Sequence, residues 1–165
     1  MKYSFDTNIF ININKKYPRE EDNDDVWELI ESKLENGEIL VSEEVIEELK
    51  EGTDDLAKWL TDNFPDAIVE TDDEIQRIAA EIAMEYEGWI NPEETKNRAD
   101  PYVIAVAMKY NCTVVSEEKI NRFLKDYPEQ WENQPHSVSI PFICKRKGIP
   151  HSDFVKYLIK TGDFT

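Results

Sequence analysis

The sequence predicts an α/β fold with a mostly parallel central sheet that is covered by helices on both faces. Short apolar runs of strand type alternate with amphipathic segments of helix type along the chain, and this alternation is typical of parallel sheets. One segment, residues 102–110, is apolar almost throughout, as expected of a helix that is buried on most sides. Ligands of such sheets gather at the carboxyl ends of the strands, so we expect the functional site there.

The first predicted element is a strand over residues 2–6, which enters a loop at Asp6. An apolar stretch over residues 9–13 follows this break. The polar residues 19–25 predict an exposed loop, and a helix then runs to about Asn36. The candidates for its N-cap are Asp22, Asn23 and Asp24.

The next segments continue the alternation of strands and helices. Residues 39–41 predict a brief buried strand, after which Ser42 caps a helix that ends near Gly52. Thr53 caps a further helix, and residues 67–69 predict a small strand.

A long helix is predicted from residues 71–72 to about Tyr86, because apolar residues recur there at helical spacing. Residues 88–98 predict a connection with a short helical turn. Asp100-Pro101 marks the start of the buried helix, because Pro suits the first turn and Asp complements its positive end.

The last third of the chain predicts one more strand and three further helical segments. The strand covers residues 113–116, and a short helix or turn covers residues 120–124. Two helices follow, over residues 140–147 and 152–160.

The length and the charge of the chain limit the classes of function. A chain of 165 residues predicts one domain, residues 1–165, with a C-terminal helical tail over about 140–165. Its 19 basic and 36 acidic side chains leave a net charge of −17. Residues 1–100 hold 10 basic and 29 acidic side chains, whereas residues 101–165 hold 9 and 7. Such an acidic chain repels polyanions, so neither a DNA-wrapping nor a membrane-surface protein is expected.

The cellular location and the state of the cysteines follow from the same composition. There is no apolar run of about 18 residues, so no membrane span is expected. The start of the chain is too short and too polar for a signal peptide. We therefore expect a cytoplasmic protein in which Cys112 and Cys144 are free, buried thiols.

Four acids fall where the predicted elements place them at one edge of the sheet. Asp6 ends the first strand, Glu48 lies on the helix after the second, and Asp100 opens the buried helix. Glu118 follows the strand over residues 113–116. Gathered carboxylates repel one another and raise each other's pKa. A divalent cation removes this conflict, and oxygen ligands suit Mg²⁺ or Mn²⁺.

The segments around these acids resemble the four motifs of PIN-domain nucleases. They are Phe5-Asp6-Thr7-Asn8-Ile9-Phe10, Val45-Ile46-Glu47-Glu48-Leu49, Ala99-Asp100-Pro101-Tyr102-Val103-Ile104-Ala105 and Val114-Val115-Ser116-Glu117-Glu118. Their order and spacing agree with the family across residues 1–120. The tail, from Ile140-Pro141-Phe142-Ile143-Cys144 to Gly148-Ile149, resembles that of a PIN-like branch of poorly described bacterial and archaeal proteins.

The resemblance implies a three-layer α/β/α fold and an endoribonuclease that depends on Mg²⁺ or Mn²⁺. Many members of the family are toxins of toxin–antitoxin pairs and often form dimers, so an antitoxin protein and a homodimer are the partners implied. By position, Asp6, Glu48, Asp100 and Glu118 would be the catalytic and metal-binding acids. Asp6 and Asp100 would hold the ion, and Glu48 or Glu118 would orient or deprotonate the attacking water.

Supporting polar positions and two departures from the family pattern complete the predicted site. Asn8 and Ser116 match polar positions that support the acids. Ser116 stands where a Thr is usual, and Glu118 stands where an Asp is usual. Glu117 could therefore be the acting fourth acid in place of Glu118.

An RNA substrate needs cations near these acids. The candidates at the tail are Lys145, Arg146 and Lys147, and Lys15 and Lys16 are placed in a loop just after the first motif. The remaining candidates, before the buried helix, are Lys96 and Arg98.

Two other functions remain open. An acid after a strand is also typical of aspartyl-phosphate phosphatases, although these need a second Asp where this chain has Asn8. The net charge of −17 is also compatible with a non-catalytic acidic binding module or a nucleic-acid mimic.

Overall fold

The computed structural model describes residues 1–19, 24–94 and 97–162. Its centre is a five-stranded sheet with the strand order β3-β2-β1-β4-β5, and every pairing in it is parallel. The strands are β1 (Lys2–Phe5), β2 (Ile39–Ser42), β3 (Ile68–Val69), β4 (Cys112–Val115) and β5 (His151–Ser152). The predicted parallel sheet is thus confirmed.

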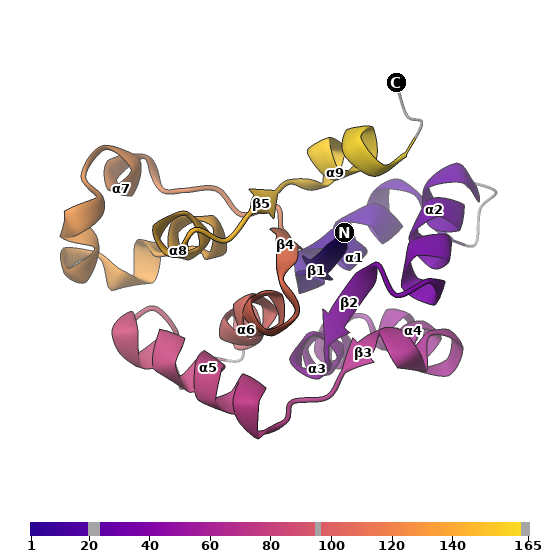
Figure 1. The fold of residues 1–165 in the computed structure, drawn as a ribbon, viewed down its shortest axis with the longest axis horizontal. Helices are drawn as coiled ribbons and strands as arrows, with labels where there is room; N and C mark the ends of the chain where they lie inside the picture. Colours follow the sequence, from indigo (N-terminus) through magenta and orange to yellow (C-terminus); the bar gives the residue numbers. More distant parts are fainter. Residues whose placement is uncertain (20–23, 95–96, 163–165) are drawn as a thin grey trace.

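The α-helices of the described residues connect and cover these strands (Figure 1). They are α1 (Thr7–Lys16), α2 (Asp24–Glu35), α3 (Glu43–Gly52), α4 (Asp54–Asn63), α5 (Asp73–Glu85), α6 (Asp100–Tyr110), α7 (Arg122–Asp126), α8 (Ile140–Lys147) and α9 (Phe154–Thr161). Short 3-10 helices cover Pro65–Ala67, Pro128–Asn133 and Pro135–Ser137.

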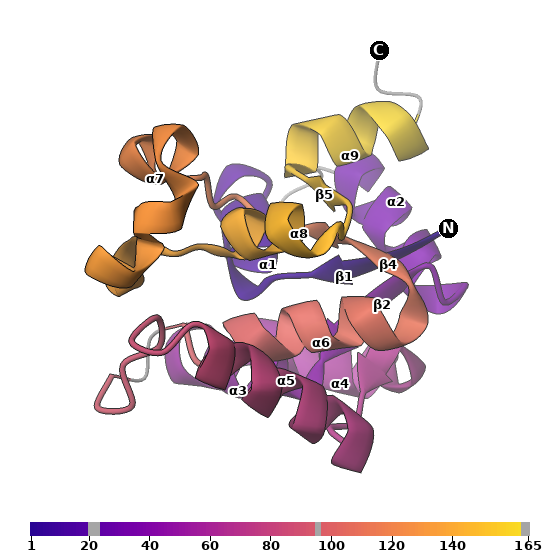
Figure 2. The same ribbon diagram turned by 60° about the vertical axis from the view of Figure 1, so that its left-hand side comes forward.

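The side chains of β1 alternate between the two faces of the sheet and define three layers. The Ser4 hydroxyl donates a hydrogen bond to the carbonyl oxygen of Val103 on α6, at 2.8 Å. Tyr3 and Phe5 point to the opposite face, where both rings meet the edge of Tyr157 on α9, at centroid distances of 4.8 and 5.1 Å. Helix α5 lies outside α6, whereas α9 lies across the sheet from them (Figure 2). The fold is therefore the three-layer α/β/α arrangement that the sequence predicts.

Helix α6 is the buried helix that its apolar sequence predicts. It packs along β1, β2 and β4, and its buried side chains include every residue from Val103 to Ala107. Asn111 ends it in the left-handed conformation, with φ of 56°, which Asn tolerates better than most residues. Ala99, and not Asp100, occupies the N-cap, so Asp100 lies in the first turn.

The strand register brings the candidate residues to one edge. Phe5 pairs with Val115, and Val115 pairs with Ser152, so β1, β4 and β5 end side by side. Asp6 and Ser116, the first residues beyond their strands, are hence neighbours at the carboxyl edge. This edge holds the candidate site.

Two elements differ from the prediction near this edge. Helix α1 begins at Thr7 with no intervening loop, because the Asp6 carboxylate caps it by accepting a hydrogen bond from the Thr7 amide at 2.8 Å. The apolar stretch 9–13 is therefore helical. Strand β5 occupies His151–Ser152, where a helix from residue 152 was predicted, and α9 begins only at Phe154. A two-residue strand is too short to produce an alternating pattern.

Two predicted helix caps and the state of the cysteines are confirmed, whereas Thr53 stands at the N-cap of α4 without a side-chain hydrogen bond and Asp24 is the first residue of α2. Ser42 caps α3 and Asp72 caps α5 with their side chains. Cys112 and Cys144 are free and buried. Asp22 and Asn23 lie outside the described residues. None of the described helices combines the length and the hydropathy needed to cross a lipid bilayer.

Candidate active site

A pocket of about 280 Å³ opens at the carboxyl edge of the sheet. Three of the four predicted acids line it, namely Asp6, Glu48 and Asp100. They come from the end of β1, from α3 and from the start of α6, so segments far apart in sequence meet here. The structure thus brings together residues that the sequence only placed at a common edge.

Asp6 is the most constrained of these acids. Asp6 is 2% exposed, and within the described residues its carboxylate accepts a hydrogen bond from the Thr7 amide alone. Burial, together with the neighbouring Glu118 and Glu48 carboxylates, raises the pKa of Asp6 to about 8, although the hydrogen bond from the Thr7 amide lowers it. Asp6 therefore holds a proton near neutral pH unless a cation compensates its charge.

Asp100 faces Asp6 from the first turn of α6 and is 3% exposed. Burial raises the pKa of Asp100 well above its ordinary value, and Asp6, Glu118 and Glu48 add to this effect. Its buried Oδ2 atom receives no hydrogen bond from any donor in the described part of the chain. A buried carboxylate oxygen without a partner is costly, which marks this atom as a position for a ligand.

Glu48 is oriented by Thr7. The Thr7 hydroxyl donates a hydrogen bond of 2.6 Å to Oε1 of Glu48, which links α1 to α3 across the pocket. Glu48 is half-buried, whereas Glu47, one residue earlier, is exposed on the solvent side of α3. The role of Thr7 in orienting Glu48 was not predicted from the sequence. Its position directly after Asp6 was the one signal that could have indicated this role.

Glu118, and not Glu117, joins the acidic group. The Glu118 carboxylate accepts a hydrogen bond from the Ile140 amide at 3.1 Å, and it lies close enough to the Asp100 carboxyl group to interact with it. Burial raises the pKa of Glu118, although the Ile140 amide and the interaction with Asp100 lower it. Glu117 instead accepts a hydrogen bond from the Phe154 amide at the start of α9. The two neighbouring acids thus serve different helices.

The supporting residues lie at the rim and beneath the site. Asn8 is exposed and lines the pocket beside Asp6. Ser116 is fully buried, and its hydroxyl forms a hydrogen bond of 2.7 Å with Nε2 of His151 on β5. This link was not predicted, because β5 itself was not. Asn97, with a left-handed φ of 65°, also lines the pocket.

The donor set suits a hard divalent cation. All candidate ligands are carboxylates, burial and then mutual repulsion raise the pKa values of Asp6 and Asp100, and Oδ2 of Asp100 has no partner among the described residues. As placed, no three acidic, His or Cys side chains of the described residues form a ready cage. Because Mg²⁺ keeps several waters and needs only one or two carboxylates directly, Asp6 and Asp100 fit such an ion as direct ligands.

The predicted RNA-binding cations are less well placed. Lys15 and Lys16 lie in the last turn of α1 and not in a loop at the site; the helix carries them about 13 Å along its axis from Thr7. Arg98 holds its own connection through hydrogen bonds to the carbonyl oxygens of Pro92 and Glu94. Lys96 lies outside the described residues.

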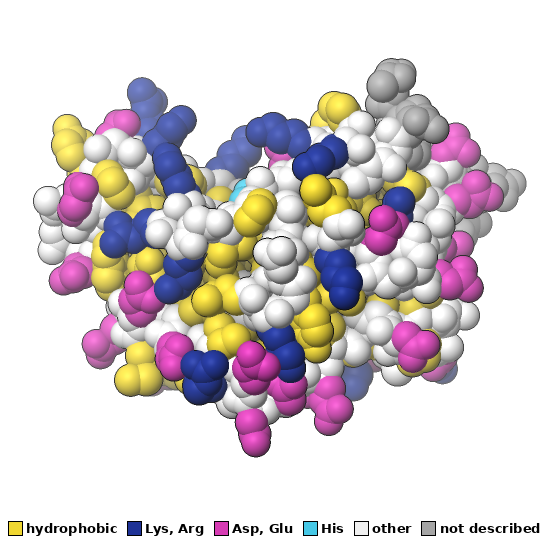
Figure 3. Space-filling model, in the orientation of Figure 1, with side chains coloured by type: hydrophobic (Ala, Val, Ile, Leu, Met, Phe, Trp, Pro, Cys, Tyr) yellow, Lys and Arg dark blue, Asp and Glu magenta, His cyan; other side chains and the backbone are white. Residues whose placement is uncertain are grey.

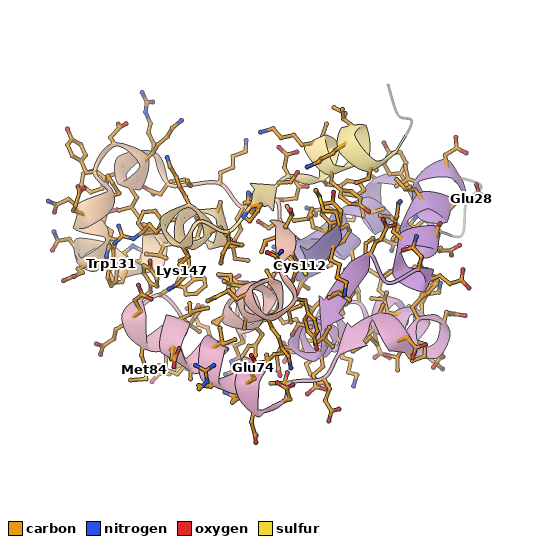
Figure 4. All side chains as sticks on the ribbon, in the orientation of Figure 1. Glu28, Glu74, Met84, Cys112, Trp131 and Lys147 are labelled. Atoms are coloured by element: carbon orange, nitrogen blue, oxygen red, sulfur yellow. The ribbon has the colours of Figure 1, made fainter. Side chains whose placement is uncertain are left out.

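Two of the three tail cations contact α5. Arg146 donates a hydrogen bond to the Tyr86 hydroxyl, and Lys147 forms an ion pair of 2.7 Å with Glu85. Figure 4 shows Lys147 at the end of α8, on the side that faces α5. Lys145 is exposed. Arg146 and Lys147 thus hold α8 against the end of α5. These contacts are a structural explanation for the basic end of α8.

Comparisons with known proteins agree with this fold. The chain is similar to a chain in the crystal structure of VapBC2 from Rickettsia felis bound to a DNA fragment from their promoter, with a TM-score of 0.53 and 18% sequence identity. The match covers 93% of this chain and 99% of that chain. At this identity the likeness shows the fold alone, and it agrees with the PIN-like architecture that the motifs imply. No curated protein matches the chain. The model of DUF4411, a domain of unknown function, matches residues 3–163, and the chain therefore belongs to the DUF4411 family.

Proposed function

We propose that the chain is an endoribonuclease that depends on Mg²⁺ or Mn²⁺. The observation that carries this proposal is the pairing of Asp6 and Asp100, both almost fully buried, beside Glu118 at the carboxyl edge of a parallel sheet. Buried carboxylates with strongly raised pKa values are typical of functional sites. The folded chain holds these carboxylates close together although they repel one another. Such an arrangement is expected where a bound cation offsets their charge.

Each acid has a distinct role in this proposal. Asp6 and Asp100 would hold the cation, because they are buried and Oδ2 of Asp100 lacks a partner. Glu48, fixed through one oxygen by the Thr7 hydroxyl, would orient the attacking water with its other oxygen. Glu118, held at the start of α8, would complete the acidic group and accept a proton.

The reaction is hydrolysis of a phosphodiester. A bound divalent cation supplies charge neutralisation at the phosphate and lowers the pKa of water. The water oxygen attacks phosphorus in line, its proton passes to Glu48 or Glu118, and the bond from phosphorus to the 3′ oxygen breaks. The products are a 5′-phosphate and a 3′-hydroxyl, the latter after its oxygen takes up a proton.

A protein partner forms part of the proposal. The similar chain comes from VapBC2, which was crystallised with a fragment of promoter DNA. We infer for this chain a toxin-type role in which an antitoxin protein restrains the nuclease. A homodimer and a cytoplasmic location are further expectations of this role.

The test is metal-dependent cleavage of a mixed RNA pool by the wild-type chain. Asp6→Asn and Asp100→Asn should abolish cleavage, since each removes a charge that holds the cation while the side-chain shape is kept. Asp62→Asn is the matched control, because Asp62 is exposed on α4, away from the carboxyl edge. Cleavage should require Mg²⁺ or Mn²⁺ and stop with EDTA.

The contrary results identify the alternatives. Cleavage that survives in both site variants would refute the assignment of the site. A folded wild-type chain that cuts no RNA and binds no Mn²⁺ at millimolar concentration would favour a non-catalytic binding module, whereas one that binds Mn²⁺ without cutting would indicate a narrow substrate. A phosphorylated Asp6 recovered after incubation with phosphate esters would favour a phosphatase.

A further inference from the structure

A second hollow lies between α7 and α9. It has a volume of about 510 Å³ and is lined from one side by Lys119 and Lys125 and from the other by Lys156. His151 and Ser152 of β5 also line it. Figure 3 shows Lys and Arg side chains gathered on both sides of a hollow along the upper edge of the molecule. We call this hollow the α7–α9 groove.

The lysines of the α7–α9 groove have no acidic partners. Lys119, Lys125 and Lys156 are all exposed. No carboxylate in the described residues lies within ion-pair distance of them, whereas Lys33, Lys50, Arg77, Lys109 and Lys147 all form such pairs. Other lysines of the chain are also unpaired, but these three line one hollow together, and in a chain of net charge −17 such a gathering of positive charge is a candidate site for an anionic ligand.

The acids that line the same groove are occupied by helix N-termini. The Glu117 carboxylate accepts from the Phe154 amide, and the Asp153 carboxylate accepts from the Lys156 amide, both at the start of α9. Glu118 accepts from the Ile140 amide at the start of α8. The positive ends of two helices thus offset these carboxylates, while the three lysines remain available to a ligand.

Glu118 connects the groove to the candidate active site. It lines the groove, and its carboxylate interacts electrostatically with those of Asp6 and Asp100 in the acidic group. A phosphate chain that contacts lysines on both walls would therefore pass Glu118. The net charge of −17 repels such a chain from the molecule as a whole, so a groove lined by three lysines is the favoured approach.

We propose that the α7–α9 groove binds the phosphate backbone of a single RNA strand and guides it to the acidic pocket. Naming the strand as RNA rests on the proposed function, but the binding itself does not require catalysis. Lys119 and Lys125 contact phosphates on the α7 side, and Lys156 contacts them on the α9 side. Lysines that contact phosphates position a strand without reading its sequence, so the groove supplies affinity and not sequence choice.

The experiment measures binding of a labelled single-stranded RNA of about 12 nucleotides to the full chain, in EDTA, by fluorescence anisotropy. The substitutions Lys119→Gln, Lys125→Gln and Lys156→Gln are combined in one variant. Each lost phosphate contact removes about 0.7 from the slope of log affinity against log salt for a single strand. We expect the slope to fall by about 2 and the affinity to fall by about tenfold at moderate salt.

The control removes the same charge elsewhere. Lys2→Gln, Lys58→Gln and Arg77→Gln are combined; all three cations are exposed, on β1, α4 and α5, and none of them lines the groove or the acidic pocket. This variant should bind within about twofold of the wild type, because it changes only the distant field. A groove variant that carries Arg at all three positions should restore both affinity and slope.

The outcomes separate this inference from the proposed function. Equal losses in the groove variant and the control variant would overturn it, because they would reflect net charge alone. Unchanged RNA binding in the groove variant would also overturn it and would favour a protein partner for the groove. The cleavage assay on the wild type tests the nuclease activity independently of the binding assay. Cleavage by the wild type with unchanged binding in the groove variant would overturn only the groove. Weaker binding in the groove variant without cleavage by the wild type would overturn only the nuclease activity.

Discussion

Replacing Asp6 by Asn should stabilise the chain at neutral pH when no divalent cation is bound. Asn has the same shape and keeps an oxygen that can accept the Thr7 amide hydrogen bond, so the cap of α1 survives. What the substitution removes is a buried charge that burial, Glu118 and Glu48 all disfavour. A variant that loses activity is therefore expected to gain stability.

The magnitude follows from the pKa of Asp6, which folding raises from 3.8 to about 8. A raised carboxyl pKa makes the folded state bind more protons than the unfolded state, so stability falls as pH rises from about 4 to about 8. At pH 7 the loss is at most about 4 kcal/mol, and at pH 5 it is at most about 1.6 kcal/mol, since each pH unit contributes about 1.4 kcal/mol. The Asp6→Asn variant has no carboxyl group at this position to ionise, so its stability should not fall in this way as the pH rises.

The assay is thermal unfolding followed by circular dichroism in EDTA at several pH values between 5 and 8. For a domain of this size, each kcal/mol shifts Tm by about 2–4 °C. The variant should therefore melt several degrees above the wild type at pH 7, and the difference should shrink toward pH 5. Addition of Mn²⁺ should reverse the order, because only the wild type retains the full set of ligands.

Asp62→Asn is the control for the general effect of removing one negative charge. Asp62 is exposed on α4, and its variant should melt with the wild type at every pH. A folded Asp6→Asn variant that is no more stable than the wild type at pH 7 would refute the reasoning. So would a stability gain that does not change with pH.

Three further predictions concern the site and the core. The stabilisation by Mn²⁺, measured as the shift of Tm, should increase from pH 6 to pH 8, because binding displaces protons from carboxyl groups of raised pKa; a constant shift would argue against these ligands. Glu118→Gln should abolish cleavage, whereas Glu117→Gln should keep it and change stability by less than about 1 kcal/mol, because Gln keeps an oxygen that accepts the hydrogen bond from α9; the opposite pattern in activity would make Glu117 the fourth acid. Burial raises the pKa of Cys112 to about 11 and that of Cys144 to about 12, so a thiol reagent at pH 8 should label neither residue until the chain is unfolded.

The positions of Asp6 and Asp100 were predictable because local sequence defines them. Asp6 follows an apolar strand, and Asp100 stands before a Pro at the start of an apolar helix. In both cases the neighbouring residues alone mark the point where a helix begins, so the signal is short-range. The parallel sheet was predictable for a similar reason, since alternation of strands and helices along the chain leaves few other arrangements.

The choice between Glu117 and Glu118 required the tertiary structure. The two residues are adjacent beyond β4, and nothing local decides which one turns toward Asp6 and Asp100. The Glu117 carboxylate accepts a hydrogen bond from an amide at the start of α9. The Glu118 carboxylate accepts one from an amide at the start of α8 and interacts with the Asp100 carboxyl group. Helices more than 20 residues further along the chain thus make the distinction.

The sequence by itself determined the succession of strands and helices along the chain, the buried helix α6 and the acids at the strand ends. Periodicity, helix caps and turn residues act over only a few positions, so local sequence is enough for these features. Tertiary structure alone decided which of these groups meet. Thr7 reaches Glu48 across 41 positions, Ser116 meets His151 through a strand of two residues, and lysines of α7 and α9 face one another across a groove. Such contacts depend on how the layers pack, and packing is a property of the whole chain that no local pattern records.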